Sequence, residues 1–117
     1  MREKVIDLDE VMERVQDDRE LLEELLEIFE EDHQEKISLL KGVVEEGGFE
    51  QIKDITHSMK GAAGNISAKA IYSTCARIEQ MAAKRDINEI KECVSVLEEQ
   101  FRAFREEANK LRAIWAQ

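Results

Sequence analysis

Apolar residues recur at helical spacing along most of this chain, with charged residues between them. Three stretches each gather their apolar residues on a single helical face. In the first of these the face consists of Leu22, Leu25, Phe29, Ile37, Leu40 and Val44. In the second it consists of Ile71, Cys75, Ile78 and Ala82. In the third it consists of Ile90, Val94, Leu97, Phe101, Phe104, Ala108, Leu111 and Trp115. The pattern predicts amphipathic helices that bury one face against each other.

Capping signals and glycines divide the pattern into five helices. An aspartate followed three residues later by glutamate is typical of a helix start, because both can satisfy free backbone amides. Such pairs begin at Asp7, Asp17 and Asp86. Gly47-Gly48 and residues 65–67 are typical of turns, and Lys84-Arg85 fit the last turn of a helix. The predicted helices span about 7–16, 17–46 and 49–66, followed by a fourth from the turn at 65–67 to about 85 and a last one beginning at 86.

Helices joined by short connections bury their apolar faces by packing antiparallel. We therefore predict an all-α fold, an antiparallel up-down four-helix bundle with a short additional N-terminal helix. It forms a single domain over 1–117, with the bundle core at about 18–111. The absence of proline supports long helices. The spacing in the last helix also suits a coiled-coil seam, although two consecutive phenylalanines there favour a bundle core. Whether residues 107–117 project past the bundle stays open.

Charge and composition exclude several classes of function. The net charge of −10 argues against binding to nucleic acid or to an anionic membrane surface. No apolar stretch approaches the length of a membrane span or a signal peptide, so we expect a cytoplasmic protein. Cys75 and Cys93 lie far apart in apolar patterns. We expect them to be buried thiols in a reducing compartment rather than a disulfide.

The two histidines fall on opposite kinds of surface. His33 lies among Phe29, Ile37 and Leu40, so we expect it at or in the core. The helix predicted over 49–66 has a core face made of Ile52, Ile55, Met59, Ala62, Ala63 and Ile66. Its opposite face consists of Lys53, Asp54, His57, Lys60, Gly61 and Gly64. Of the two histidines, only His57 is therefore expected to face outward as a nucleophile.

Two glycines follow His57 on the same helical face. Glycine inside a helix costs about 1 kcal/mol relative to alanine, so Gly61 and Gly64 require a reason. Gly64 could end the helix, and Gly61 could allow a neighbouring helix to pack closely. The functional interpretation is that both keep side chains away from His57, so that another protein can approach it. Lys60 lies one turn from His57 and could neutralise negative charge added to the imidazole.

The sequence from His57 to Ile66, HSMKGAAGNI, resembles the signature of histidine-containing phosphotransfer (HPt) domains of two-component phosphorelays. The likeness extends from about residue 21 to 111. It implies a four-helix bundle with His57 as phosphoacceptor, Lys60 stabilising the phosphoryl group, and Gly61 and Gly64 leaving room for the partner. Lys53 and Asp54 complete the expected partner-binding face.

In several relatives, the resemblance implies, an acidic or amide residue on the next helix hydrogen-bonds the acceptor imidazole. Glu79 has the matching spacing, and Gln80 is the alternative if the helix register differs. Many members have a further glycine where this chain has Ser67. Serine is still small and is a good helix cap, so this departure affects the turn more than the acceptor.

The resemblance implies a phosphoryl carrier. A neutral imidazole would accept the phosphoryl group from a receiver-domain aspartate and return it to another. The chain has no nucleotide-binding motif, so we expect no ATP site of its own, no cofactor and no metal. The expected partners are receiver domains of response regulators, including those of a hybrid sensor kinase, and the expected state is a monomer.

Three alternatives remain from the sequence. The chain could be a non-catalytic helical adaptor in which His57 is incidental. It could be a metal-binding bundle, although the two histidines occupy different environments. It could be the dimerisation unit of a histidine kinase, although the glycines beside His57 fit that poorly. The sequence does not identify the donor, the acceptor or the pathway.

Overall fold

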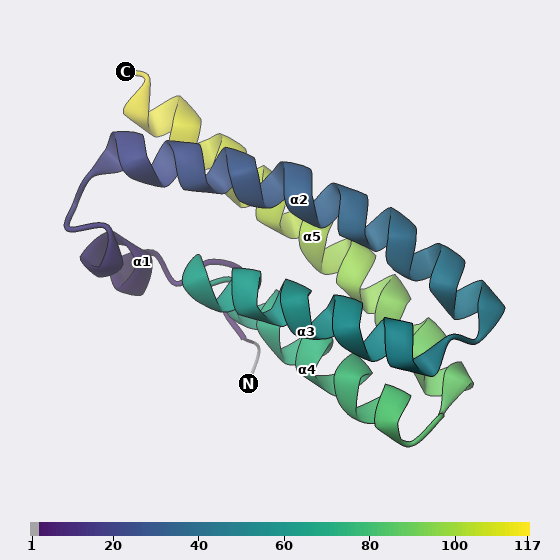
Figure 1. Cartoon of the computed structure of the whole chain (residues 1–117). Coiled ribbons are helices and arrows are strands. Elements are labelled where there is room, and N and C mark those ends of the chain that lie inside the picture. The colour runs from purple at the N-terminus through teal and green to yellow at the C-terminus, as the bar shows by residue number, and fades with distance from the viewer. Residues whose placement is uncertain (1–2) are drawn as a thin grey trace.

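The computed structural model describes residues 3–117, and within them it contains five α-helices and no strand. The helices are α1 (Leu8–Arg14), α2 (Arg19–Glu46), α3 (Phe49–Asn65), α4 (Lys69–Ala83) and α5 (Ile87–Trp115). Helices α2 to α5 lie side by side with alternating directions, and α1 lies against one end of them (Figure 1). The predicted all-α bundle with a short extra helix is confirmed. Among the described residues, no helix combines the length and the apolar character needed to cross a membrane.

Two of the three predicted helix starts are confirmed. The Asp7 side chain accepts a hydrogen bond from the Glu10 amide at 3.2 Å, and Asp86 does the same for Glu89 at 3.1 Å. The prediction for α2 is wrong by one residue, because Asp18 rather than Asp17 forms the cap. Asp17 has a φ of 62° and belongs to the turn before the helix. Two adjacent aspartates offer the same capping chemistry, so the pattern alone does not choose between them.

The turns lie close to their predicted places. Gly47 ends α2 with a φ of 69°, a left-handed conformation that favours glycine, and Gly48 precedes α3. The chain turns again at Ile66 and Ser67 after α3 ends. The prediction for Lys84-Arg85 is wrong, because α4 ends at Ala83.

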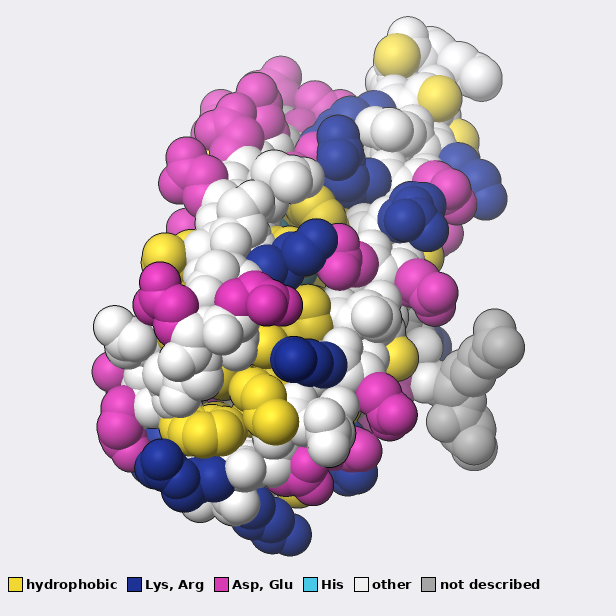
Figure 2. Space-filling view, turned by 90° about the vertical axis from the view of Figure 1, so that its right-hand side faces the viewer, with side chains coloured by type: hydrophobic (Ala, Val, Ile, Leu, Met, Phe, Trp, Pro, Cys, Tyr) yellow, Lys and Arg dark blue, Asp and Glu magenta, His cyan; other side chains and the backbone are white. Residues whose placement is uncertain are grey.

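Arg85 leaves the helix because its backbone is left-handed, with a φ of 57°. Its guanidinium lies 4.7 Å from the centre of the Phe49 ring at the start of α3. Figure 2 faces the end of the bundle where α2 joins α3 and α4 joins α5, and hydrophobic side chains are visible there among charged ones. The contact between Arg85 and Phe49 links the α4–α5 connection to the α2–α3 connection, and these two connections close that end of the bundle.

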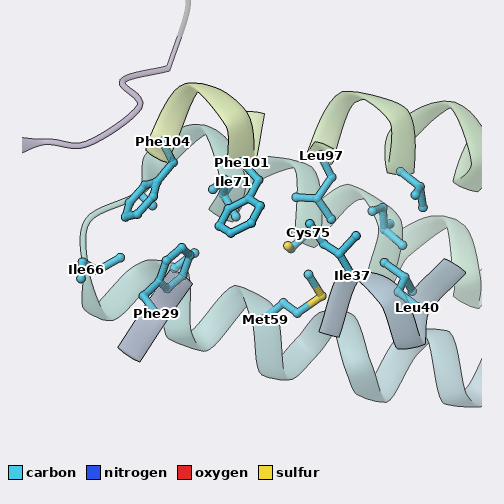
Figure 3. Close-up of a cluster of buried hydrophobic side chains, with 14 of the residues drawn as sticks. Phe29, Ile37, Leu40, Met59, Ile66, Ile71, Cys75, Leu97, Phe101 and Phe104 are labelled. Carbon is cyan, nitrogen blue, oxygen red and sulfur yellow. The ribbon is translucent and has the colours of Figure 1, made fainter. Parts of the chain in front are cut away.

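The predicted apolar faces form the core with a few corrections. On α4 the whole face is buried, and on α5 every member is buried except Trp115, which is partly exposed. On α2, Leu26 is completely buried and Leu25 is only partly so. Figure 3 shows side chains from several helices meeting in the middle of this core, among them Ile37, Met59, Cys75, Leu97 and Phe101.

The core face of α3 is rotated slightly from the prediction. Ile55 and Ala62 are only partly buried, whereas Thr56 is completely buried. The Thr56 hydroxyl donates a hydrogen bond to the Ile52 carbonyl oxygen at 2.8 Å, which satisfies it inside the core. Helix α3 packs more extensively against α4 than against α2, and the buried face therefore turns toward α4.

His33 is a core residue, as predicted, with 1% of its surface exposed. Its ring stacks on Phe29 at 5.1 Å and lies 4.6 Å from the Phe101 ring, measured between ring centres. Burial lowers the pKa of His33 to about 4, against the smaller opposing charge of Asp32. His33 is therefore neutral at physiological pH and serves packing.

The cysteines are free and buried, as predicted. Burial raises the pKa of Cys75 to about 12, which keeps the thiol protonated at neutral pH. Burial also raises the pKa of the Cys93 thiol. Thiols in this state are weak nucleophiles, so both act as small apolar residues in the core.

The C-terminal part of α5 remains against the bundle as far as Trp115. Ala108 and Leu111 are buried, and Arg112 donates to the carboxylate of Glu30 on α2 at 3.2 Å. Beyond this point Ile114 is 62% exposed. Residues 107–115 therefore stay against the bundle, because Trp115 is partly buried against the core while its neighbour Ile114 faces solvent at the C-terminal end of α5 (Figure 1).

Helix α1 is tied to the turn between α3 and α4 by a polar cluster. The Glu10 carboxylate accepts hydrogen bonds from the Ser67 hydroxyl and the Lys69 ammonium, each at 2.8 Å. The Asp7 amide donates to the Ser67 carbonyl oxygen at 2.9 Å. Ser67 has a φ of 56°, a conformation that favours glycine. Its hydroxyl compensates for that strain by holding α1 in place.

Candidate functional site

His57 lies in the middle of α3 and faces outward, with 72% of its side chain exposed. The buried residues Ile52, Met59 and Ala63 fix the opposite face of the same helix in the core. The sequence predicted this contrast between His57 and the buried His33, and the structure confirms it. The imidazole of His57 is thus accessible to another molecule without any change in the fold.

Glu79 on α4 approaches His57 and Lys60 together. One carboxylate oxygen, Oε2, lies 3.0 Å from His57 Nδ1. The other, Oε1, accepts a hydrogen bond from Lys60 Nζ at 3.3 Å. The residue that contacts the imidazole is therefore Glu79, whereas Gln80 is an exposed residue of α4. The axial shift between the antiparallel helices α3 and α4 brings the three side chains together.

The charge on Glu79 follows from three competing effects. Burial is the largest and raises the pKa of Glu79. The hydrogen bonds from His57 and Lys60, with their charges, act in the opposite direction and together outweigh it, so the net pKa is lowered. The carboxylate is ionised at neutral pH and acts only as an acceptor. An imidazole nitrogen that hydrogen-bonds this carboxylate must be the donor, so the contact at 3.0 Å requires a proton on Nδ1 of His57.

Gly61 leaves the helix surface beside His57 bare. A Cβ atom at Gly61 would meet no atom within 4 Å, so close packing does not require glycine here. At Gly64 a Cβ would lie 3.4 Å from the ring of Tyr72, which is ordinary van der Waals contact. Gly64 does not end the helix either, because α3 continues to Asn65. Neither packing nor capping therefore explains the two glycines.

Comparison with known proteins agrees with this geometry. The Hpt domain family matches residues 24–114. This chain belongs to the Hpt domain family. No curated protein matches it significantly.

Two solved structures resemble the whole Hpt domain. The crystal structure of histidine-containing phosphotransfer protein B from Pseudomonas aeruginosa PAO1 has a TM-score of 0.85 and 22% identity, covering 93% of this chain and 95% of that one. An X-ray structure from rice, assigned as a histidine-containing phosphotransfer protein, has a TM-score of 0.86 and 17% identity, covering 97% and 85% respectively. At these identities the likeness concerns the fold.

The remaining predicted residues of the Hpt domain lie around His57. Lys53 and Asp54 are exposed on the outer face of α3, about one turn before the histidine. Gly61 and Gly64 follow it along the same face. All the residues proposed from the sequence therefore lie on one surface formed by α3 and α4.

Sequence reasoning missed two residues next to this surface. Lys36 on α2 donates to the Ser58 hydroxyl at 2.7 Å and pairs with Asp32 at 3.0 Å. Tyr72 on α4 is 43% exposed and lies against Gly64. Both approach α3 from other helices, and no local pattern in the sequence reports such a contact. Among residues 3–117, no cluster of three or more His, Cys, Asp or Glu side chains could hold a metal ion.

As an Hpt domain, the chain is a phosphotransfer protein of a phosphorelay. Chemically, its site offers one exposed nucleophilic nitrogen, one carboxylate that orients it, and one ammonium group. An Hpt domain is a phosphoryl carrier.

Proposed function

We propose that this Hpt domain carries a phosphoryl group on Nε2 of His57 and relays it between receiver-domain aspartates. The observation that supports this most directly is the pairing of the exposed His57 imidazole with the Glu79 carboxylate at Nδ1. That pairing directs the proton to Nδ1 and leaves the lone pair of Nε2 toward solvent. A nucleophile with this orientation needs no rearrangement before it meets a partner.

The transfer step follows from this geometry. Nε2 attacks the phosphorus of an aspartyl phosphate, so an N–P bond forms as the bond between phosphorus and the aspartate oxygen breaks. The aspartate leaves as a carboxylate, and the imidazole becomes positively charged. Glu79 stabilises that charge through Nδ1–H. The reverse reaction delivers the phosphoryl group to a second receiver, and Mg²⁺ is supplied by the receiver domain.

Lys60 stabilises the phosphorylated state. Its ammonium lies one turn from His57 on α3 and is already beside the shared carboxylate at 3.3 Å. A phosphoryl group on Nε2 adds negative charge next to Glu79, which is itself negative. An adjacent cation offsets that repulsion.

The partner-binding surface consists of Lys53, Asp54, Gly61 and Gly64 around His57. The bare helix surface at Gly61 supports close approach, because in-line transfer requires the aspartate and the imidazole within a few ångströms of each other. The partners are receiver domains, including those of hybrid sensor kinases. We propose that the Hpt domain meets them as a monomer, since this surface must be free.

Phosphotransfer from a labelled receiver domain tests the proposal. A receiver carrying radiolabelled phosphoryl groups is mixed with the wild-type chain, and label on the Hpt domain is measured before and after acid treatment. We expect acid-labile label on the wild type and none on His57→Gln. Gln80→Ala is the matched control, because it changes an exposed neighbour of Glu79, and it should be labelled normally. Circular dichroism verifies that each variant is folded.

Equal labelling of His57→Gln and wild type would contradict His57 as acceptor. A wild-type chain that no receiver of the source genome labels would contradict the relay itself. Profiling against all those receivers also identifies the donor and the acceptor by their rates.

A further inference from the structure

The turn of α3 that carries His57 is contacted from both sides. On the α4 side, Glu79 Oε2 lies 3.0 Å from His57 Nδ1. On the α2 side, Lys36 Nζ donates a hydrogen bond at 2.7 Å to the hydroxyl of Ser58, the residue directly after His57. The ammonium group of Lys36 therefore lies level with the imidazole, on the flank of α3 opposite Glu79.

The direction of Nε2 gives this position of Lys36 a chemical meaning. The two nitrogens of an imidazole point in divergent directions, because a carbon atom separates them in the ring. With Nδ1 of His57 turned toward α4, Nε2 points outward and away from α4. A phosphoryl group on Nε2 thus leans toward α2. Lys60 stays beside Glu79, at 3.3 Å, and the phosphoryl oxygens on the α2 side require a cation of their own.

Lys36 is held in a way that lets it change one of its partners. Its side chain is 26% exposed, its four-carbon stem is flexible, and its ammonium has three donor protons. The ammonium is shared between the Asp32 carboxylate, at 3.0 Å, and the neutral Ser58 hydroxyl. Hydrogen bonds to a charged acceptor are stronger than those to a neutral one. A phosphoryl group would therefore displace Ser58 from Lys36 and leave the pair with Asp32 in place.

We propose that Lys36 on α2 is a second cation of the phosphoryl site, which moves from the Ser58 hydroxyl to a phosphoryl oxygen when His57 is phosphorylated. This inference rests on the proposed function, because it concerns the phosphorylated state of His57. It gives α2 a part in the chemistry, in addition to α3 and α4. Ser58 is then the resting partner of Lys36 and is dispensable for transfer.

The change of partner is measured by ¹H–¹⁵N NMR of the lysine ammonium groups. The protein is phosphorylated with phosphoramidate, a small-molecule phosphoryl donor that requires no receiver, and spectra are recorded before and after. The Nζ resonance of Lys36 should shift on phosphorylation, and this shift should be absent in His57→Gln. Lys41 is the matched control, because it also lies on α2 but pairs with Glu98 on α5, so its resonance should not move.

Variants separate binding of the phosphoryl group from a structural contact between α2 and α3. At equilibrium with a receiver domain, the ratio of phosphorylated Hpt domain to phosphorylated receiver should be about two- to fivefold lower for Lys36→Met than for wild type, the range of exposed ion pairs. Added salt should reduce this difference. Lys36→Arg keeps the charge and should lie closer to wild type than Lys36→Met. Ser58→Ala should match wild type, because Lys36 still reaches the phosphoryl group.

Two results would overturn the proposal. The first is a phosphorylated protein in which the Lys36 resonance does not move, and a shift at Lys53 alone would assign the role to α3. The second is a Ser58→Ala protein that loses as much as Lys36→Met, which would mean that the contact only joins two helices. Failure of the proposed function is a different result, because receivers would then leave wild type unlabelled while phosphoramidate still phosphorylates His57.

Discussion

Two chemically identical side chains in this Hpt domain have opposite roles because of where the helices place them. His57 is 72% exposed and bonded to a carboxylate, whereas His33 is 1% exposed and lies between the Phe29 and Phe101 rings. Within residues 3–117, the buried Nε2 atom of His33 has no hydrogen-bond partner. Such an atom lowers stability, and the imidazole would lower it further if protonated. Of the two histidines, only His57 is therefore accessible to a partner.

The burial of His33 predicts an acid-sensitive fold. Its pKa is about 4 in the folded state and about 6.5 when unfolded, so the unfolded chain binds a proton first as the pH falls. The contribution of neutral His33 to the free energy of unfolding is fully present above pH 6.5, and it is lost progressively as the pH falls to about 4. The shift of about 2.5 pKa units corresponds to about 3 kcal/mol. Urea unfolding at pH values from 7.5 to 4.5 measures this loss in the free energy of unfolding.

The control for this prediction is His33→Leu, which keeps an apolar side chain in the same space. Its stability should fall less with acid than that of the wild type, and the difference between the two proteins should grow below pH 6.5. Parallel stability curves for the two proteins would mean that other groups cause the acid sensitivity.

At the scale of elements, α3 combines two conflicting tasks. Its inner face holds the core together, while its outer face carries the histidine and two glycines that weaken a helix. The stabilising contacts come from its neighbours, since α4 supplies the carboxylate and α1 holds the turn through Ser67 and Glu10. The chemistry of this Hpt domain therefore depends on how α3 packs between other helices.

Gly61 offers a test of that conflict. Because a Cβ there would meet nothing within 4 Å, Gly61→Ala should stabilise the domain by up to about 1 kcal/mol. Gly61→Gln should remain folded but slow transfer from a receiver, since its side chain stands beside His57. Urea unfolding and transfer rates give the two measurements. Gly64→Ala is the comparison, because there the new methyl group would contact Tyr72. Transfer to Gly61→Gln at the wild-type rate would show that bare surface is not required.

At the scale of the whole molecule, we expect repulsion between like charges to outweigh the individual ion pairs. The chain has 27 acidic and 17 basic residues, a net charge of −10. The ion pairs among residues 3–117 involve mainly exposed or half-exposed side chains, such as Lys41 with Glu98. Pairs of this kind contribute about 0–1 kcal/mol each. The outer face of α2 repeats acidic residues at helical spacing, for example Glu24, Glu27 and Glu31, where like charges repel.

Salt should therefore stabilise this Hpt domain. Raising NaCl from about 20 to about 300 mM screens both attraction and repulsion, and repulsion dominates here. The melting temperature should rise, as measured by circular dichroism. In a variant with Gln at positions 24, 27 and 31, it should be higher at low salt and less sensitive to added salt. A melting temperature that falls with salt would mean that the ion pairs dominate instead.

Much of this architecture could be predicted because it depends on local pattern. A helical period of apolar residues places Ile78 or Leu97 inward and His57 outward whatever the neighbouring helices do. The residues at which individual helices begin and end depend on more than this pattern. Asp17 and Asp18 offer equal caps, and the end of α4 depends on the left-handed conformation of Arg85, which tertiary contact with Phe49 favours.

The sequence was sufficient for the number of helices, for the outward face that carries His57, and for the family likeness, because each of these follows from residues close together in the chain. It was not sufficient to decide that Glu79 shares its carboxylate between His57 and Lys60, or that Ser67 holds α1. Those contacts join residues 19 to 57 positions apart. They depend on the axial shift and rotation of one packed helix against another, and a shift of one residue would exchange Glu79 for its neighbour.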